Sequence, residues 1–220
     1  MNVKLVSYSK PADEFLEEGL ENVQDLIAFC AKVSNPTAQI NKETSERLIK
    51  YLIKHQHWSP LEMVNAVLEI NTTRDIAHQI VRHRSFAFQE FSQRYANPEE
   101  QGDMFEYSEA RLQDPKNRQN SVEVEDAKLQ QEWDWAQRRI AVLAKKEYDW
   151  AIKKGIAKEQ ARKVLPEGLT KTRLYMNGTL RSWVHYIDLR GANGTQKEHM
   201  DIAHECAKII AEIFPLMKTL

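Results

Sequence analysis

Cysteine, glycine and proline are scarce in this 220-residue sequence, which holds 2, 7 and 7 of them. Cys30 and Cys206 are too few for a disulfide framework or a four-cysteine zinc site. With little glycine or proline to interrupt regular structure, we expect long helices and strands. No apolar run approaches the roughly 20 residues of a membrane span, and the N-terminal residues lack an apolar signal segment. We therefore expect a cytoplasmic protein that makes no membrane contact.

Charge of one sign is not in excess either. Lys and Arg number 31 and Asp and Glu number 32, which gives a net charge of −1. Proteins that bind the nucleic-acid backbone usually carry a large basic excess, so no nucleic-acid partner is expected. Hydrophobic residues make up 42% of the chain, which is enough for one packed core and argues against disorder.

Hydrophobic periodicity predicts helices and strands in both halves of the chain. The predicted strands cover residues 3–8, 64–71, 85–95 and 170–176. The predicted helices cover residues 20–33, 43–55, 73–81, 122–154, 158–165, 180–190 and 197–213, and residues 97–120 are expected to form a polar loop. This mixture predicts a single α+β domain over residues 1–220, with a central, mostly antiparallel sheet flanked by long helices.

The long helix predicted at 122–154 carries two tryptophans that cannot face the same core. Trp133 and Trp135 lie about 200° apart around a helix. Two interpretations stay open: one tryptophan packs against another subunit, or it is a surface side chain half covered by a loop.

The densest polar cluster lies between Arg74 and Arg94. This window holds four arginines and no lysine. Arginine differs from lysine in its planar guanidinium, which grips a phosphate or carboxylate by two parallel hydrogen bonds. The cluster therefore predicts an anion site for a phosphate ester or a nucleotide. The alternative is a set of ion pairs with Asp75 and Glu90, but two acids cannot match four arginines.

Two regular elements would gather the polar side chains of this cluster. The predicted helix places three of them on one face, at i, i+3 and i+4: Gln79, Arg82 and His83. The predicted strand directs three others to one side: Glu90, Ser92 and Arg94. Aromatic residues between them add apolar surface, which strengthens ionic contacts by lowering the local dielectric.

The run RHRSFAFQEFSQRY, residues 82–95, resembles the signature RHRxxSxNExSxRY of flavin-dependent thymidylate synthases. The matching residues are Arg82, His83, Arg84, Glu90, Ser92, Arg94 and Tyr95. Ala87 and Gln89 depart from the signature, which has Ser and Asn there. The segment HWSPLE at 57–62 and the segment from Thr179 through Arg190 resemble two further parts of the family pattern. In the second of these, Thr179 and His185 replace amides.

The resemblance implies conversion of dUMP to dTMP, with methylenetetrahydrofolate as one-carbon donor, reduced FAD as hydride source and NADPH as the reductant of the flavin. It also implies a homotetramer whose active sites combine residues from several subunits. The implied FAD contacts are His57, Ser59, Arg82, His83, Arg84, Glu90, Thr179, Arg181 and His185. The implied dUMP contacts are Gln79, Arg82, Glu90, Ser92, Arg94, Arg162 and Arg190.

One residue of this implied set is expected to act on the reacting ring. Arg190 would lie at the uracil edge and favour loss of the N3 proton, because a nearby cation stabilises the anion that forms. No cysteine nucleophile is expected, since Cys30 lies on an apolar helix face and Cys206 lies within a predicted helix, neither in a basic setting.

Three other functions stay open. His55, His57, His78 and His83 would suit a metal-dependent hydrolase, although no HExxH motif is present and no bound metal is expected. The same arginines and aromatic residues would serve a nucleotide- or RNA-binding module without turnover. The departures at Ala87, Gln89, Thr179 and His185 leave open a flavin- and nucleotide-binding relative with little or no synthase activity.

Overall fold

Four strands form the central sheet of the computed structural model, which describes residues 2–219. Their order is β1 (Asn2–Tyr8), β2 (Asn65–Thr73), β6 (Lys171–Thr179) and β3 (Ala87–Glu90). Every neighbouring pair is antiparallel, and β2 and β6 pair along their whole length. The expected antiparallel sheet is therefore confirmed, and it joins strands that are far apart in the sequence. The domain limits 1–220 stay a prediction, and residues 1 and 220 lie outside the described residues.

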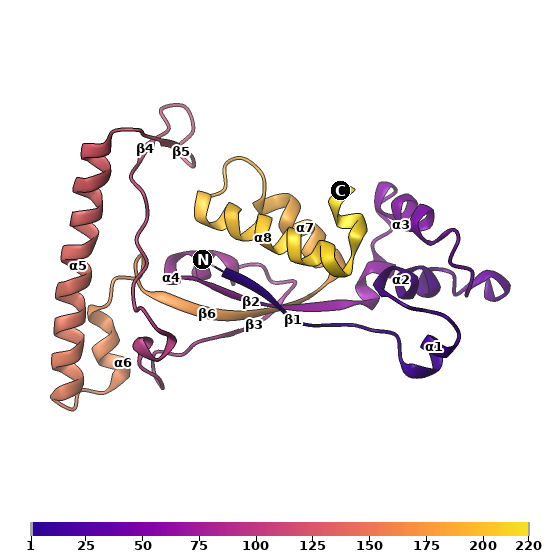
Figure 1. Cartoon of the computed structure of the whole chain (residues 1–220), viewed down its shortest axis with the longest axis horizontal. Helices are drawn as coiled ribbons and strands as arrows, with labels where there is room; N and C mark the ends of the chain where they lie inside the picture. Colours follow the sequence, from indigo (N-terminus) through magenta and orange to yellow (C-terminus); the bar gives the residue numbers. More distant parts are fainter. Residues whose placement is uncertain (1, 220) are drawn as a thin grey trace.

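Helices cover one face and both ends of this sheet. They are α1 (Asp13–Glu17), α2 (Val23–Ala31), α3 (Ser45–Lys54), α4 (Arg74–Ile80), α5 (Ala127–Lys153), α6 (Lys158–Ala161), α7 (Leu180–Arg190) and α8 (Lys197–Ile213). Figure 1 shows α7 and α8 across one sheet face, α2 and α3 at one end, and α5 upright at the other end beside α6. Within the described residues, every helix is too short or too polar to cross a bilayer.

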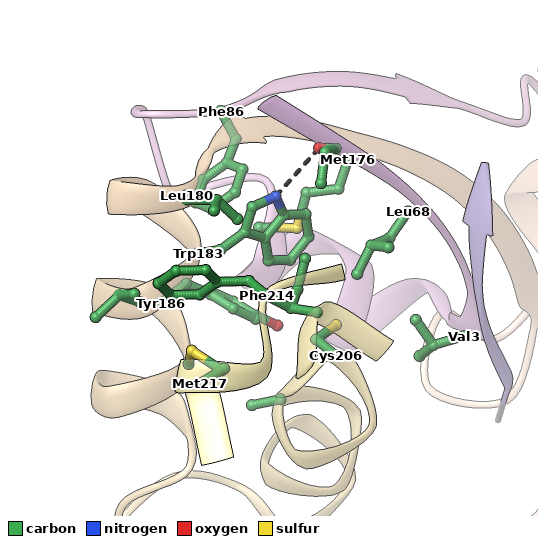
Figure 2. Packing of buried hydrophobic residues seen from close by; sticks show 14 of the residues in the cluster. Val3, Leu68, Phe86, Met176, Leu180, Trp183, Tyr186, Cys206, Phe214 and Met217 are labelled. Carbon is green, nitrogen blue, oxygen red and sulfur yellow. Dashed lines mark hydrogen bonds between the residues drawn. The ribbon is translucent and has the colours of Figure 1, made fainter. Parts of the chain in front are cut away.

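The core lies between the sheet and helices α7 and α8. Trp183 is fully buried there, and its indole Nε1 donates a hydrogen bond to the Ala66 carbonyl oxygen at 3.1 Å (Figure 2). Alternate residues of β2, such as Leu68 and Ile70, face this core, while the residues between them are partly exposed. The period-two pattern of the strand thus decides which sheet face the helices cover.

A glycine in β6 fixes where the segment after α4 crosses the sheet. The ring of Phe86 packs on Gly178, and a Cβ at position 178 would lie 2.4 Å from Cδ1 of that ring. Phe86 also meets Trp183 edge-on, with the ring centroids 4.9 Å apart. Because no larger residue fits at 178 without moving Phe86, this contact holds the arginine-rich turn at 81–86 against the core.

The predicted strand over residues 85–95 is wrong at both ends, since only Ala87–Glu90 pairs in the sheet. The segment around Met104 takes the neighbouring position along β6: the Lys171 N–H donates to the Met104 carbonyl at 2.9 Å, and Phe105 bridges Thr170. Residues beyond 91 find no free edge on β6 and form a turn instead.

The helices predicted at 180–190 and 197–213 are present with those bounds as α7 and α8, and the other predicted elements have shifted ends. α5 begins at Ala127 rather than at 122, because the Asp126 side chain caps it by accepting hydrogen bonds from two backbone N–H groups. The residues before it form β5 (Ser121–Glu123), which pairs with β4 (Arg111–Gln113) inside the region predicted to be a loop. The helix predicted at 20–33 is shorter for the same reason, since Asn22 caps α2.

Candidate functional site

Two candidate residues from distant parts of the chain meet where α4 and α7 end. The Arg190 Nε–H donates a hydrogen bond to His83 Nε2 at 2.8 Å. Burial, and then the charge of Arg190, lower the pKa of His83 to about 4. His83 is therefore neutral near pH 7 and can accept this bond. Among the described residues no carboxylate pairs with Arg190, so its positive charge is held in place but not neutralised.

Gln79, in the last turn of α4, joins the same region through α8. Its Nε2 donates to Gln196 Oε1 at 2.7 Å, and its Oε1 lies 3.3 Å from His199 Nδ1. The other ring nitrogen of His199 lies 3.1 Å from the Tyr186 hydroxyl. His199 and Gln196 were not foreseen from the sequence, because nothing in the helical pattern of residues 197–213 separates a polar core histidine from a surface one.

Glu90 is engaged by residues of its own chain. It pairs with Arg74 Nη1 at 3.2 Å and accepts a hydrogen bond from the Thr172 hydroxyl at 2.9 Å. Arg74 Nε also lies 3.0 Å from Glu167. The ion-pair alternative for the arginine cluster therefore holds for Arg74, and it does not extend to Arg82 or Arg84.

Arg82 and Arg84 are exposed, and neither guanidinium has a hydrogen bond or ion pair within residues 2–219. The predicted helical face is wrong, because α4 ends at Ile80 and leaves both arginines and His83 in the following turn. The turn sends His83 inward to Arg190 and both arginines outward. Two unpaired cations on one turn suit an anionic ligand.

The strand face expected for Glu90, Ser92 and Arg94 is also wrong, because β3 ends at Glu90. Arg94 Nε instead lies 3.7 Å from the Glu159 carboxylate of α6, with both side chains about half exposed. Arg162 follows three residues later and has no side-chain partner within the described residues. The structure thus brings Arg94 to the segment that carries Arg162.

The remaining flavin candidates gather at the start and middle of α7. The Thr179 hydroxyl caps this helix by accepting from the Ser182 N–H at 3.2 Å, a role that threonine shares with asparagine. Arg181 pairs with Glu62, and His185 meets Trp58 edge-on with ring centroids 4.5 Å apart. The segment 57–62, including the exposed His57 and Ser59, therefore lies against α7.

The surroundings of both cysteines favour the protonated thiol. Cys206 is fully buried on α8, and burial raises the pKa of its thiol well above the usual range. Burial also raises the pKa of the half-buried Cys30. Both thiols are protonated near pH 7, whereas nucleophilic attack needs the thiolate. Within residues 2–219 no group of three or more His, Cys, Asp or Glu side chains is arranged to hold a metal ion.

The candidates thus form separate groups on one chain. Gln79, His83 and Arg190 meet at the ends of α4 and α7, and Glu90 pairs with Arg74. Arg94 approaches the segment of Arg162, while Thr179 and Arg181 lie at the start of α7 and His185 lies in its middle. No hydrogen bond or ion pair among residues 2–219 joins Arg94 to the group around Arg190.

Comparison with known proteins identifies the family. Residues 16–216 match the family described as "Thymidylate synthase complementing protein". The chain is 47% identical over 215 residues to the probable flavin-dependent thymidylate synthase of Paramecium bursaria Chlorella virus 1, covering 98% of this chain and 96% of that protein. It is 46% identical, with the same coverage, to the flavin-dependent thymidylate synthase of Synechocystis sp..

A solved structure shares the fold. The UMP/dUMP methylase PolB from Streptomyces cacaoi, bound with 5-Br dUMP, superposes with a TM-score of 0.78 at 23% identity, over 98% of this chain and 92% of that one. The predicted α+β fold is confirmed. The class is therefore an α+β enzyme, and the chain belongs to the flavin-dependent thymidylate synthase family.

Proposed function

We propose that this chain catalyses the reductive methylation of dUMP to dTMP, with methylenetetrahydrofolate as one-carbon donor and FAD reduced by NADPH as hydride carrier. The proposal rests on the family and on one observation in the site. Arg190 is held by a neutral histidine and has no carboxylate partner among the described residues. A fixed cation without a counter-charge is what stabilisation of a developing anion requires.

Arg190 would act on the uracil ring of dUMP. A cation beside the imide favours the form that has lost the N3 proton, and the resulting negative charge makes the ring more nucleophilic toward the one-carbon unit. His83 keeps the guanidinium oriented by accepting its Nε–H, and it adds no negative charge that would cancel the effect. This route needs no cysteine, which agrees with the two protonated thiols.

The phosphate of dUMP would be held by arginines that have free donors. Arg82 and Arg162 have no side-chain partner among residues 2–219, and Arg94 has one long contact to an exposed carboxylate. Charge-assisted bidentate bonds to phosphate are among the strongest available to these side chains. These arginines would complete the site of a neighbouring copy, as the resemblance to the family implies.

FAD, when bound, would supply the hydride for the methyl group. The chain offers it two surfaces: the turn with Arg82, His83 and Arg84, and the start and middle of α7 with Thr179, Arg181 and His185. Arginine side chains suit the pyrophosphate of such a cofactor. The exposed side chains of segment 57–62, packed beside α7, add to the second surface.

Assembly into a homotetramer is supported by α5. Its inner face is buried and includes Ala144 and Tyr148, yet Trp135 and Val142 on the opposite face are 55% and 71% exposed. A helix that is apolar on two faces is typically covered on both. A second copy of this chain would bury the outer face of α5, which also gives Trp135 the intersubunit role left open by the sequence.

A visible absorption spectrum combined with product analysis tests the proposal. Purified protein should carry oxidised flavin that bleaches with NADPH under anaerobic conditions, and it should form dTMP once dUMP and methylenetetrahydrofolate are added. A protein that neither contains nor takes up FAD contradicts the proposal. Flavin that bleaches without any dTMP formation would favour the alternative of a flavin- and nucleotide-binding relative.

A further inference from the structure

A buried histidine outside the family motif lies within a row of hydrogen bonds that joins the core to the exposed Gln196. His199 is 0% exposed in the first turn of α8, and both its ring nitrogens have partners. The row runs, in order, through Tyr186, His199, Gln79, Gln196, Glu198 and Arg111. Gln79 lies between His199 and Gln196 in this row. Among these six residues it is the only candidate substrate contact.

The direction of these hydrogen bonds is set at the end with Glu198 and Arg111, whose side chains are 15% and 11% exposed. Glu198 contacts the guanidinium of Arg111, so its carboxylate accepts hydrogen bonds. Gln196 must then turn its Nε2 toward Glu198, at 3.1 Å, and its Oε1 toward Gln79. Gln79 must in turn present Nε2 to Gln196, and therefore Oε1 to His199.

The same argument fixes the hydrogen bonds of His199 and Tyr186 in the core. With Gln79 Oε1 opposite Nδ1, His199 must carry its proton on Nδ1 and leave Nε2 bare to accept from the Tyr186 hydroxyl. Burial lowers the pKa of His199 to about 3, assisted by the charge of Arg190, so the ring has a single proton near pH 7. Burial raises the pKa of Tyr186, so its hydroxyl stays a donor. Each hydrogen bond in this row thus joins one donor to one acceptor.

We propose that His199 is a positioning residue that locks the side-chain amide of Gln79 in one orientation and so favours a uracil over a cytosine ring. An amide that rotates freely can offer its donor and acceptor in either order, and uracil and cytosine differ in the order of donor and acceptor on their pairing edges. A locked amide matches one order only. This selectivity rests on the proposed function, in which Gln79 contacts dUMP.

The position of His199 in the structure agrees with this role. The His83 ring, bonded to Arg190, lies 6.2 Å from the His199 ring and 5.0 Å from Tyr186, centroid to centroid. His199, which orients Gln79, therefore lies in the same packed cluster as Arg190, the cation proposed to act at the uracil edge. A fixed polar group beside a fixed charge discriminates between ligands because neither adapts to the wrong one.

The tautomer of His199 gives the first test and needs no nucleotide. Nitrogen-15 NMR of histidine-labelled, FAD-loaded protein should show His199 protonated on Nδ1 alone, with the H199Q spectrum assigning its signal. In E198Q, a neutral amide replaces the carboxylate and the row can run in either direction, so the two tautomers should mix. A wild-type His199 protonated on Nε2 would refute the proposed orientation of the Gln79 amide.

Titration calorimetry of dUMP and dCMP into the FAD-loaded protein gives the second test. H199Q loses the donor at the Nδ1 position, whereas H199N retains one there. The ratio of the two affinities should fall about 10-fold in H199Q and E198Q, the value of one net hydrogen bond, and stay near wild type in H199N. H204Q, the same change at an exposed position of α8, is the control.

The outcomes distinguish failure of the proposed role of His199 from failure of the proposed function. A melting temperature that falls in H199Q while the affinity ratio is unchanged would mean a merely structural histidine and would overturn the selectivity. Wild-type protein that binds neither nucleotide would refute the proposed function, while the Nδ1-protonated tautomer would still show whether the row of hydrogen bonds is correctly directed.

Discussion

Acid should destabilise this protein through a histidine that folding keeps neutral. His199 has a pKa of about 3 in the folded chain, against 6.5 for a free side chain, because burial disfavours its charged form and Arg190 and His83 lie near it. Between these two values the unfolded chain binds a proton that the folded chain does not. The free energy of unfolding therefore falls as the pH falls through this range.

The size of the effect follows from the two pKa values. Lowering the pH from about 7.5 to about 5 should cost about 2 kcal/mol through His199 alone. H199Q removes the titrating group, so its loss of stability over the same range should be smaller by about that amount. H199Q will be less stable than wild type at both pH values because a buried hydrogen-bond partner changes. The quantity to compare is the change in the free energy of unfolding between the two pH values, in H199Q and in wild type.

Urea unfolding at both pH values, at one protein concentration, measures this difference. H204Q, which removes an exposed imidazole from the same helix, is the control variant. If H199Q lost as much stability on acidification as wild type, the buried imidazole would not be the group that takes up the proton, and the assignment of a neutral His199 would be refuted.

Four further outcomes are expected from single substitutions. R190A should abolish dTMP formation while the visible spectrum still shows bound flavin; loss of flavin would mean that Arg190 is misassigned. R94K should weaken dUMP binding by about 1.5–3 kcal/mol in titration calorimetry, through loss of a bidentate phosphate contact, and unchanged affinity would remove Arg94 from the phosphate site. T179A should lower the free energy of unfolding by about 1 kcal/mol in urea through loss of the α7 cap, and an unchanged free energy would mean that the hydroxyl does not stabilise the helix. V142E should reduce the assembly to smaller species in light scattering, and an unchanged mass would exclude the outer face of α5 from the interface.

The sequence predicted most of the regular elements and the reaction class because both depend on local patterns. Alternation in residues 64–71 and helical spacing in residues 197–213 mark β2 and α8, since each side chain's face is set by its place in the repeat. The motif at 82–95 identified the family, which the comparison with known proteins confirmed. These signals lie within short stretches of chain.

The end of β3 and the pairing of side chains were decided by tertiary contacts. The strand through Glu90 stops because the segment around Met104 holds the next position on β6, more than ten residues away. His83 became an acceptor for Arg190 because α4 ends before it and α7 brings the arginine from the other end of the chain. His199 carries no pattern of its own. Its role follows from burial and from the fixed charge of Glu198, because the direction of a hydrogen bond depends on every partner beyond it.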